Sequence, residues 1–171
     1  MEIPMKLIVS LCIIISVSTG YLYSAAMDKE LEEKKIARLI ERFVDVCKKS
    51  NFKEASKLTT GKEKKIFSSM LKDIKRRNGM ITKEMRYYFQ RLREVKVDVV
   101  KIGKSEKKAV AICTLEFRYF DSKSRDEIRK DREVYYLLLR IKGKWKISNS
   151  KLYRERTYYR TKTHRKWRRK G

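Results

Sequence analysis

The chain has 171 residues, of which 39% are charged, and its formal net charge is +25 at pH 7. The length that remains after a hydrophobic leader suits one domain with a buried core, and no internal repeat or linker divides it. One histidine and the two cysteines after the leader form no recognisable zinc pattern, so we expect no metal site and no cofactor.

The leader is an uncharged block, LIVSLCIIISVSTGYLYSAA, at residues 7–26, directly behind Lys6. Its apolar start has the length of a signal-peptide core, and small residues before Ala26 suit cleavage after that residue. An uncleaved anchor is the alternative, because 20 residues at about 1.5 Å each just span a bilayer core. A buried helix of a soluble domain is a third reading. We therefore expect an exported protein, periplasmic or secreted, or one anchored to the membrane by residues 7–26.

Four helices are predicted next, since apolar residues recur at three-and-four spacing. Residues 29–49 form the longest, and a short second helix follows with Asn51 as its cap. Residues 62–77 form the third. Residues 82–93 form a fourth, short helix, with Thr82 as its predicted cap.

After Arg93 the apolar period changes to two, which predicts strands at residues 95–99, 109–119, 135–141 and 145–149. The second strand carries one long apolar face: Ala109, Ala111, Cys113, Leu115, Phe117 and Tyr119. The third collects on one face Tyr135, Leu137, Leu139 and Ile141. Charged residues 121–132 are interpreted as a connection. Helices followed by a meandering sheet predict the α+β class, with the helices packed on one face of a four-stranded antiparallel sheet.

This order of elements, with YYLLLRIKGKWKISNSKL at Tyr135–Leu152 and KSNFKEASKL at Lys49–Leu58, resembles the nuclear-transport-factor-2-like superfamily. The resemblance covers about residues 30–155. It implies helices lying against a strongly curved sheet, in a cone with a pocket. The predicted domains are a signal peptide or anchor at 1–26, a nuclear-transport-factor-2-like domain at 27–153 and a basic tail at 154–171. The superfamily holds both enzymes and binding domains, so the fold does not choose the function.

Catalytic candidates are few. Asp98 and Glu116 could be pocket carboxylates with shifted pKa values, but their alternation with apolar neighbours favours a solvent-facing position opposite a cation. Several tyrosines could supply a pocket hydroxyl, although most are expected to pack: Tyr87, Tyr88, Tyr119, Tyr135 and Tyr136. His164 lies among the cations of the tail. We expect no catalytic residue and no enzymatic activity.

Cys47 and Cys113 both occupy apolar positions of periodic segments. In an exported protein they could form one disulfide, but the pattern favours two buried free thiols that pack as small hydrophobes.

The basic tail is the predicted polyanion-binding site. Its nine cationic residues are Arg154, Arg156, Arg160, Lys162, Arg165, Lys166, Arg168, Arg169 and Lys170. Tyr158, Tyr159 and Trp167 are interleaved with them. Because the tail follows the last predicted strand, we expect truncation after Tyr153 to leave the stability of the domain little changed.

These observations favour a non-enzymatic, extracytoplasmic binding or assembly domain of the cell envelope. Its basic surface would be attracted to an anionic membrane or an envelope polymer, and a protein partner or a homodimer through the sheet is a further expectation. A basic nucleic-acid-binding protein is the first alternative. A small pocket enzyme of isomerase or dehydratase type is the second alternative. The simplest interpretation of the charge is a solvated surface without a dedicated partner.

Overall fold

The computed structural model describes residues 28–75, 79–160 and 167–169. The predicted leader lies outside these residues, so export and anchoring stay predictions. In the part of the chain that is described, no helix is long and apolar enough to cross a membrane. The chain divides into two units, Met1–Lys35 and Ile36–Gly171, and the second contains the sheet and the candidate site.

The predicted helices are present with small shifts at their ends. Residues 28–48 are helical, and in the first unit two ion pairs of 2.7 Å, Glu30 with Lys34 and Glu32 with Lys35, support residues 28–35. In the second unit, residues 36–48 bury one apolar face.

Three labelled helices follow in the second unit: α2 (Phe52–Leu58), α3 (Gly61–Lys75) and α4 (Met80–Gln90). The predicted cap of α2 is confirmed, since the side chain of Asn51 accepts a 3.2 Å hydrogen bond from the backbone N–H of Glu54.

The predicted cap of α4 is wrong. The N-cap is Gly79, in a left-handed conformation with φ +57°, and Thr82 lies within the helix. The backbone N–H and the hydroxyl of Thr82 both donate to Oδ2 of Asp73, at 3.3 and 3.2 Å. A carboxylate from α3 therefore takes the capping role, which also ties the two helices together.

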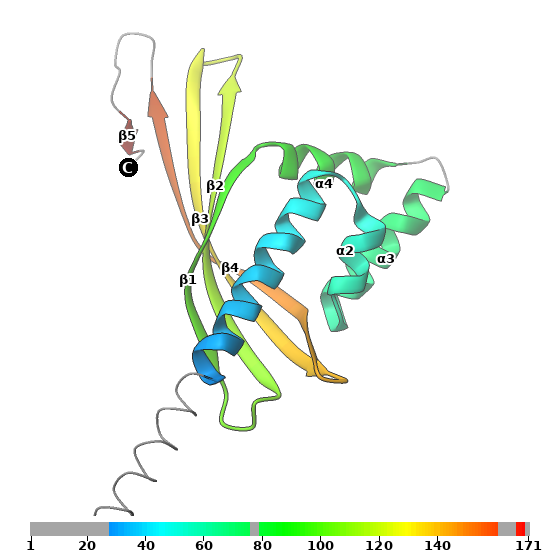
Figure 1. The fold of residues 1–171 in the computed structure, drawn as a ribbon. Coiled ribbons are helices and arrows are strands. Elements are labelled where there is room, and N and C mark those ends of the chain that lie inside the picture. The colour runs from blue at the N-terminus through cyan, green and yellow to red at the C-terminus, as the bar shows by residue number, and fades with distance from the viewer. Residues whose placement is uncertain (1–27, 76–78, 161–166, 170–171) are drawn as a thin grey trace, which may run out of the picture. The chain divides into compact units, whose positions relative to one another are not determined.

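The five strands are β1 (Leu92–Ile102), β2 (Lys108–Asp121), β3 (Asp126–Ile141), β4 (Lys144–Arg160) and β5 (Arg168–Arg169), paired antiparallel in that order. The α+β class is confirmed, with the helices gathered on one side of a curled sheet (Figure 1). The predicted number of four strands is wrong by one. Because β5 has only two residues, both arginine, it carries no apolar alternation by which a sequence reveals a strand.

The predicted charged connection is also wrong, because β3 begins at Asp126 and only residues 122–125 turn the chain. Charged side chains are tolerated in these strands because they pair with one another. Arg129 lies 2.8 Å from Asp131, Lys130 lies 3.1 Å from Glu155, and Arg160 pairs with Glu127. Such pairs replace the apolar contacts by which strands are usually recognised.

β4 likewise continues to Arg160, so the predicted boundary at Tyr153 falls inside a strand. Truncation after Tyr153 would remove the backbone pairing of residues 154–160 with β3. The expectation that stability would be unchanged therefore does not hold.

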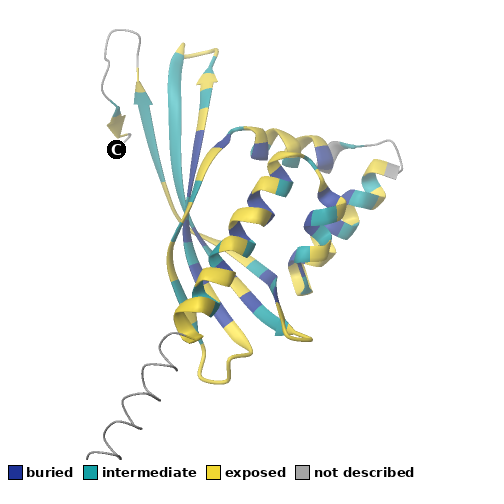
Figure 2. Cartoon of the chain, in the orientation of Figure 1, coloured by how far each residue is buried: buried dark blue, intermediate teal, exposed yellow. Residues whose placement is uncertain are grey.

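The core lies between the helices and the inner face of the sheet, where buried residues gather in Figure 2. The predicted inner face of β2 is confirmed, since it is buried from Ala109 to Phe117 and Tyr119 is half-buried. On β3 the buried residues are Val134, Tyr136 and Leu138. The group predicted from Tyr135 to Ile141 lies on the opposite, outer face, because side chains alternate along a strand.

The sheet extends beyond the helices at one end. β1 begins at Leu92, which pairs with Phe117, so Arg118–Asp121 of β2 have no β1 neighbour. The matching ends of β3 and β4, together with β5, project past the helical layer (Figure 1). We call this part of β2–β5 the projecting strands.

Candidate functional site

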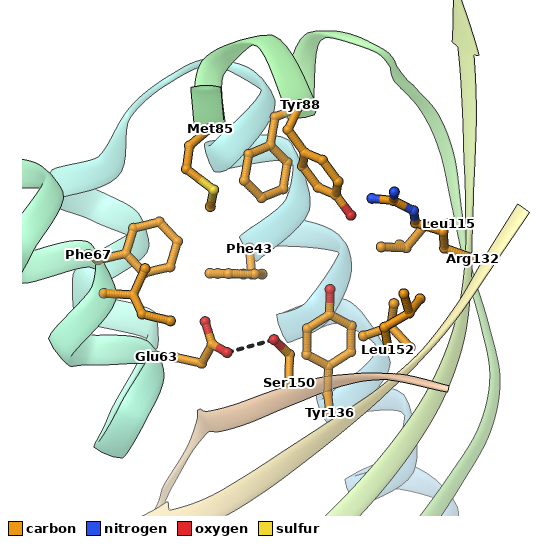
Figure 3. Close-up of a pocket in the computed structure, with 13 residues that line it drawn as sticks. Phe43, Glu63, Phe67, Met85, Tyr88, Leu115, Arg132, Tyr136, Ser150 and Leu152 are labelled. Carbon is orange, nitrogen blue, oxygen red and sulfur yellow. Dashed lines mark hydrogen bonds between the residues drawn. The ribbon is translucent and has the colours of Figure 1, made fainter. Parts of the chain in front are cut away.

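A cavity of about 290 Å³ lies between α3, α4 and the inner face of the sheet (Figure 3). Its wall consists mainly of aromatic and aliphatic side chains, with a few polar ones. The lining residues are Phe43, Glu63, Ile66, Phe67, Met85, Tyr88, Phe89, Leu115, Arg132, Val134, Tyr136, Ser150 and Leu152. An apolar cavity with a few converging polar groups is the usual form of a small-molecule site.

Glu63 supplies the carboxylate of this cavity, and it is not among the candidates predicted from the sequence. α3 carries Glu63 on the same helical face as Phe67 and Met70, so folding places all three against the core. Glu63 is 7% exposed, and the hydroxyl of Ser150 on β4 donates a 2.6 Å hydrogen bond to its Oε1. The sequence did contain a signal for this residue, because Glu63 lies on the apolar face of the predicted helix. Burial of a carboxylate is costly without a partner, so a glutamate at such a position indicates a buried polar contact.

Tyr136 supplies a hydroxyl, which points into the cavity in Figure 3. Its ring packs edge-on against Phe43, with centroids 6.3 Å apart. Burial raises the pKa of the Tyr136 hydroxyl well above its ordinary value, and nearby Cys113 acts in the same direction. This hydroxyl therefore stays protonated at neutral pH and can donate a hydrogen bond.

Arg132 lies where the cavity meets the projecting strands. Its guanidinium carbon is 5.2 Å from the ring centroid of Tyr88, and its Nε donates to Glu155. Burial raises the pKa of Tyr88, against the lowering effect of a hydrogen bond with Arg132. Burial alone would raise the pKa of Glu155, but hydrogen bonds from Arg132 and Lys130 hold it below its ordinary value.

The cavity thus combines an apolar wall with one carboxylate, one buried hydroxyl and one guanidinium. It can hold a small apolar molecule that carries a hydrogen-bonding or anionic group. Glu63 already accepts a hydrogen bond from Ser150, and Arg132 already donates one to Glu155. The polar groups of Glu63 and Arg132 are therefore positioned before any ligand enters. The same groups would be the candidates for proton transfer if the cavity were catalytic.

The two carboxylates singled out from the sequence do not enter this cavity. Asp98 lies on the outer face, where it accepts a 2.6 Å hydrogen bond from the hydroxyl of Thr114. Glu116 is on the same face, with Nε of Arg118 at 2.6 Å and Nε of Arg129 at 3.0 Å. The predicted pairing of Glu116 with a cation is confirmed, but the arginines bury it to 8% exposure, so its predicted solvent-facing position is wrong.

Two of the five predicted tyrosines, Tyr88 and Tyr136, line the cavity. The rings of Tyr87 and Tyr119 instead enclose the guanidinium of Arg91, whose carbon lies 3.6 and 4.2 Å from their centroids. This contact joins the end of α4 to β2.

The nine predicted polyanion-binding residues divide into two groups. On strands lie Arg154, Arg156, Arg160, Arg168 and Arg169. Outside the described residues lie Lys162, Arg165, Lys166 and Lys170. Arg156 lies 3.1 Å from Glu133, and Arg160 pairs with Glu127. The other three strand arginines have no ion pair within the described part of the chain.

The interleaved aromatic rings of this region lie close to the chain's own arginines. The ring centroid of Trp167 is 5.2 Å from the guanidinium carbon of Arg160 and 6.0 Å from that of Arg118. Tyr158 lies 5.4 Å from Arg129 in the same way. These intramolecular contacts compete with the stacking of a nucleic-acid base on the rings.

Cys47 and Cys113 are buried free thiols, as the sequence pattern favours. Burial raises the pKa of Cys113 to about 12, and it also raises the pKa of Cys47. His164 lies outside the described residues. Within those residues, no group of three or more His, Cys, Asp or Glu side chains could hold a metal ion.

No family model matches the chain, and no curated protein matches it. Four chains of known structure match it. One is the crystal structure of the intermembrane space region of the chloroplast protein ARC6, with a TM-score of 0.32 and 17% sequence identity. The match covers 68% of this chain and 95% of that chain. A likeness at this level assigns neither a family nor a function.

Proposed function

We propose that this chain is a non-enzymatic binding or assembly domain of the cell envelope, exported or anchored by residues 7–26. Its basic strand surface is attracted to an anionic membrane or an envelope polymer. We also propose membership of the nuclear-transport-factor-2-like superfamily, which the order of helices before a curled sheet and the cavity between them support.

One observation carries the binding proposal: Arg154, Arg168 and Arg169 lie exposed on paired strands without an ion-pair partner in the described part of the chain. The backbones of these three arginines are held in place by the pairing of β4 and β5. Less conformational entropy is therefore lost when the arginines contact a charged surface. Each exposed cation near an anionic surface contributes on the order of 1 kcal/mol. Arg154 and Arg169 lie on the outer face and Arg168 on the opposite one, because side chains alternate along a strand, so the three extend the basic surface over both faces of β4 and β5.

The experiment must separate this site from the general attraction of a protein with a charge of +25. We compare the full chain with the triple variant Arg154→Gln, Arg168→Gln, Arg169→Gln. The matched control removes three exposed lysines of α3, as Lys62→Gln, Lys64→Gln and Lys65→Gln. Both variants lose the same formal charge. Binding is measured on phosphatidylglycerol-containing vesicles and on polyphosphate, at several salt concentrations.

We expect the arginine variant to bind about tenfold or more weakly and to show a shallower salt dependence. The lysine control should stay within about threefold of the parent chain, on the same scale of charge effects. Equal losses in the two variants would mean that only the overall field acts and that no local site exists.

The nucleic-acid alternative is tested in the same titrations with a single-stranded RNA oligonucleotide. Tighter binding of RNA than of vesicles or polyphosphate at equal salt would favour that alternative. The contacts of Trp167 and Tyr158 with the chain's own arginines favour the envelope proposal. The pocket-enzyme alternative would use Glu63 and Tyr136, together with the Ser150 hydroxyl that donates to Glu63 in the cavity.

A further inference from the structure

The outer face of the sheet is apolar over the part that the helices cover from the other side. Its aliphatic residues are Val99, Val110, Ile112, Leu137, Leu139 and Ile141. The register places Val110 opposite Leu137 and Ile112 opposite Val99, so these side chains form one continuous surface. Val99, Val110, Leu137 and Ile141 are 37–40% exposed.

A sheet with one face on the core normally alternates apolar and polar residues, with the polar ones toward water. Here β2 and β3 are apolar on both faces, which is the pattern of strands covered on both sides. The helices cover the inner face only (Figure 1). Within the described residues, no element of the second unit lies over the outer apolar face.

Lysines of β1, β2 and β4 border this apolar face: Lys101, Lys108, Lys144, Lys146 and Lys151. None of the five has an ion pair within the described residues, and Asp98, the acidic residue next to Val99 on this face, is already paired with Lys96 at 3.2 Å and with the hydroxyl of Thr114. The projecting strands differ, because their arginines meet Glu116, Asp131, Glu133 and Glu127. The charge of the lysines is therefore left for an external group to neutralise.

We propose that this outer face, with its six aliphatic residues and five lysines, docks a protein partner whose contact surface is apolar at the centre and acidic at the edge. Charge complementarity selects this occupant. A second copy of this chain would bring two sets of lysines together, and like charges across an interface repel each other. The leader at residues 7–26 could cover the apolar centre but has no acidic residue to meet the lysines.

An anionic membrane would satisfy the charge, but the aliphatic side chains are partly covered by their neighbours, and the exposed aromatic ring on this face, Tyr153, packs edge-on against Tyr135 with centroids 5.1 Å apart. Interfacial membrane contacts usually rely on protruding aromatic residues. The inference deepens the proposed assembly role. It uses other residues than the arginine site, so either proposal can fail without the other.

The test places the photo-crosslinking residue p-benzoylphenylalanine at Leu137 in the full chain, expressed in the cells that produce it. The matched control places it at Phe120, which is 59% exposed on the outer face of the projecting strands. We expect a single protein adduct at position 137 and none at 120. The double substitution Lys101→Glu and Lys146→Glu should reduce the adduct at least tenfold, because it places acidic groups against an acidic edge.

The captured protein is then purified and titrated with the full chain. Support requires an affinity that falls with salt and drops at least tenfold in the lysine double variant, and also in Leu137→Asp. Circular dichroism confirms that each variant is folded, and the lysine variant decides the outcome if Leu137→Asp is not. Adducts to lipid alone, adducts to a second copy, no adduct, or a purified protein insensitive to the lysine changes would each overturn the proposal.

Discussion

Replacing Gly61 with alanine tests how closely α3 is held against β4, the contact that positions Glu63 in the cavity. Gly61 has a φ of +54°, and a Cβ at this position would lie 2.7 Å from Oγ and 3.1 Å from the carbonyl oxygen of Ser148. The N–H of Thr60 donates a 2.8 Å hydrogen bond to the carbonyl of Ile147 on the same strand. The added methyl group must therefore push the start of α3 away from β4.

Gly143 provides the matched control. It lies in the turn between β3 and β4 with a φ of +75°, and no atom lies within 4 Å of the Cβ it would gain. Alanine at either position incurs the strain of a left-handed backbone, about 1–2 kcal/mol. Only Gly61→Ala adds overpacking, which costs a further 1–3 kcal/mol or so. We expect a loss of about 1–2 kcal/mol for Gly143→Ala and about 2–5 kcal/mol for Gly61→Ala.

The free energy of unfolding is measured by urea titration of both variants and the parent chain under identical conditions. A difference of about 1–3 kcal/mol between the variants should also appear as a lower melting temperature, by roughly 2–4 °C for each kcal/mol. Equal losses would show that the start of α3 can move away from β4 without cost. The described position of Glu63 would then lack its structural support.

The remaining predictions concern titratable groups. In the folded protein, Cys47 and Cys113 should resist alkylation by iodoacetamide at pH 8, because burial raises the pKa of both thiols. Both should react once urea unfolds the chain. Rapid labelling of either cysteine in the folded protein, detected by peptide mapping, would contradict their burial. Since the pKa of Glu155 is lowered from 4.5 in the folded protein, its stabilising effect is present above that value and is lost as the pH falls through the lowered pKa. The free energy of unfolding is measured by urea titration from about pH 3 to 7. Glu155→Gln should be less stable than the parent chain at neutral pH and nearly as stable at the acid end of this range. A stability difference that does not change with pH would exclude this linkage.

The sequence predicted the helical half of the fold because local signals decide it. Three-and-four spacing of apolar residues located residues 28–48, α2, α3 and α4, and the Asn51 cap formed where the sequence predicted it. The inner face of β2 was equally predictable, since strict alternation allows only one apolar set to face the core. Each of these signals depends on neighbouring residues and needs no knowledge of the tertiary structure.

The projecting strands could not be predicted in the same way. Six of the seven residues 126–132 are charged, and they become a strand only because partners on β2 and β4 neutralise them. The core-facing side of β3 was ambiguous for a different reason. Tyr135 and Leu137 are as apolar as Val134 and Leu138, so only the helices decide which set is buried. Pairing between distant strands carries this information, and local periodicity does not.

The distribution of charge over the sheet bears more directly on function than its total. Arginines of the projecting strands are largely neutralised by carboxylates of the same sheet, so most of them are structural. The lysines beside the outer apolar face have no such partners within the described residues. A surface that served only for solubility would place its lysines among polar neighbours, because exposed aliphatic groups oppose solubility. Unpaired lysines beside an uncovered apolar centre instead match the chemistry of a binding surface.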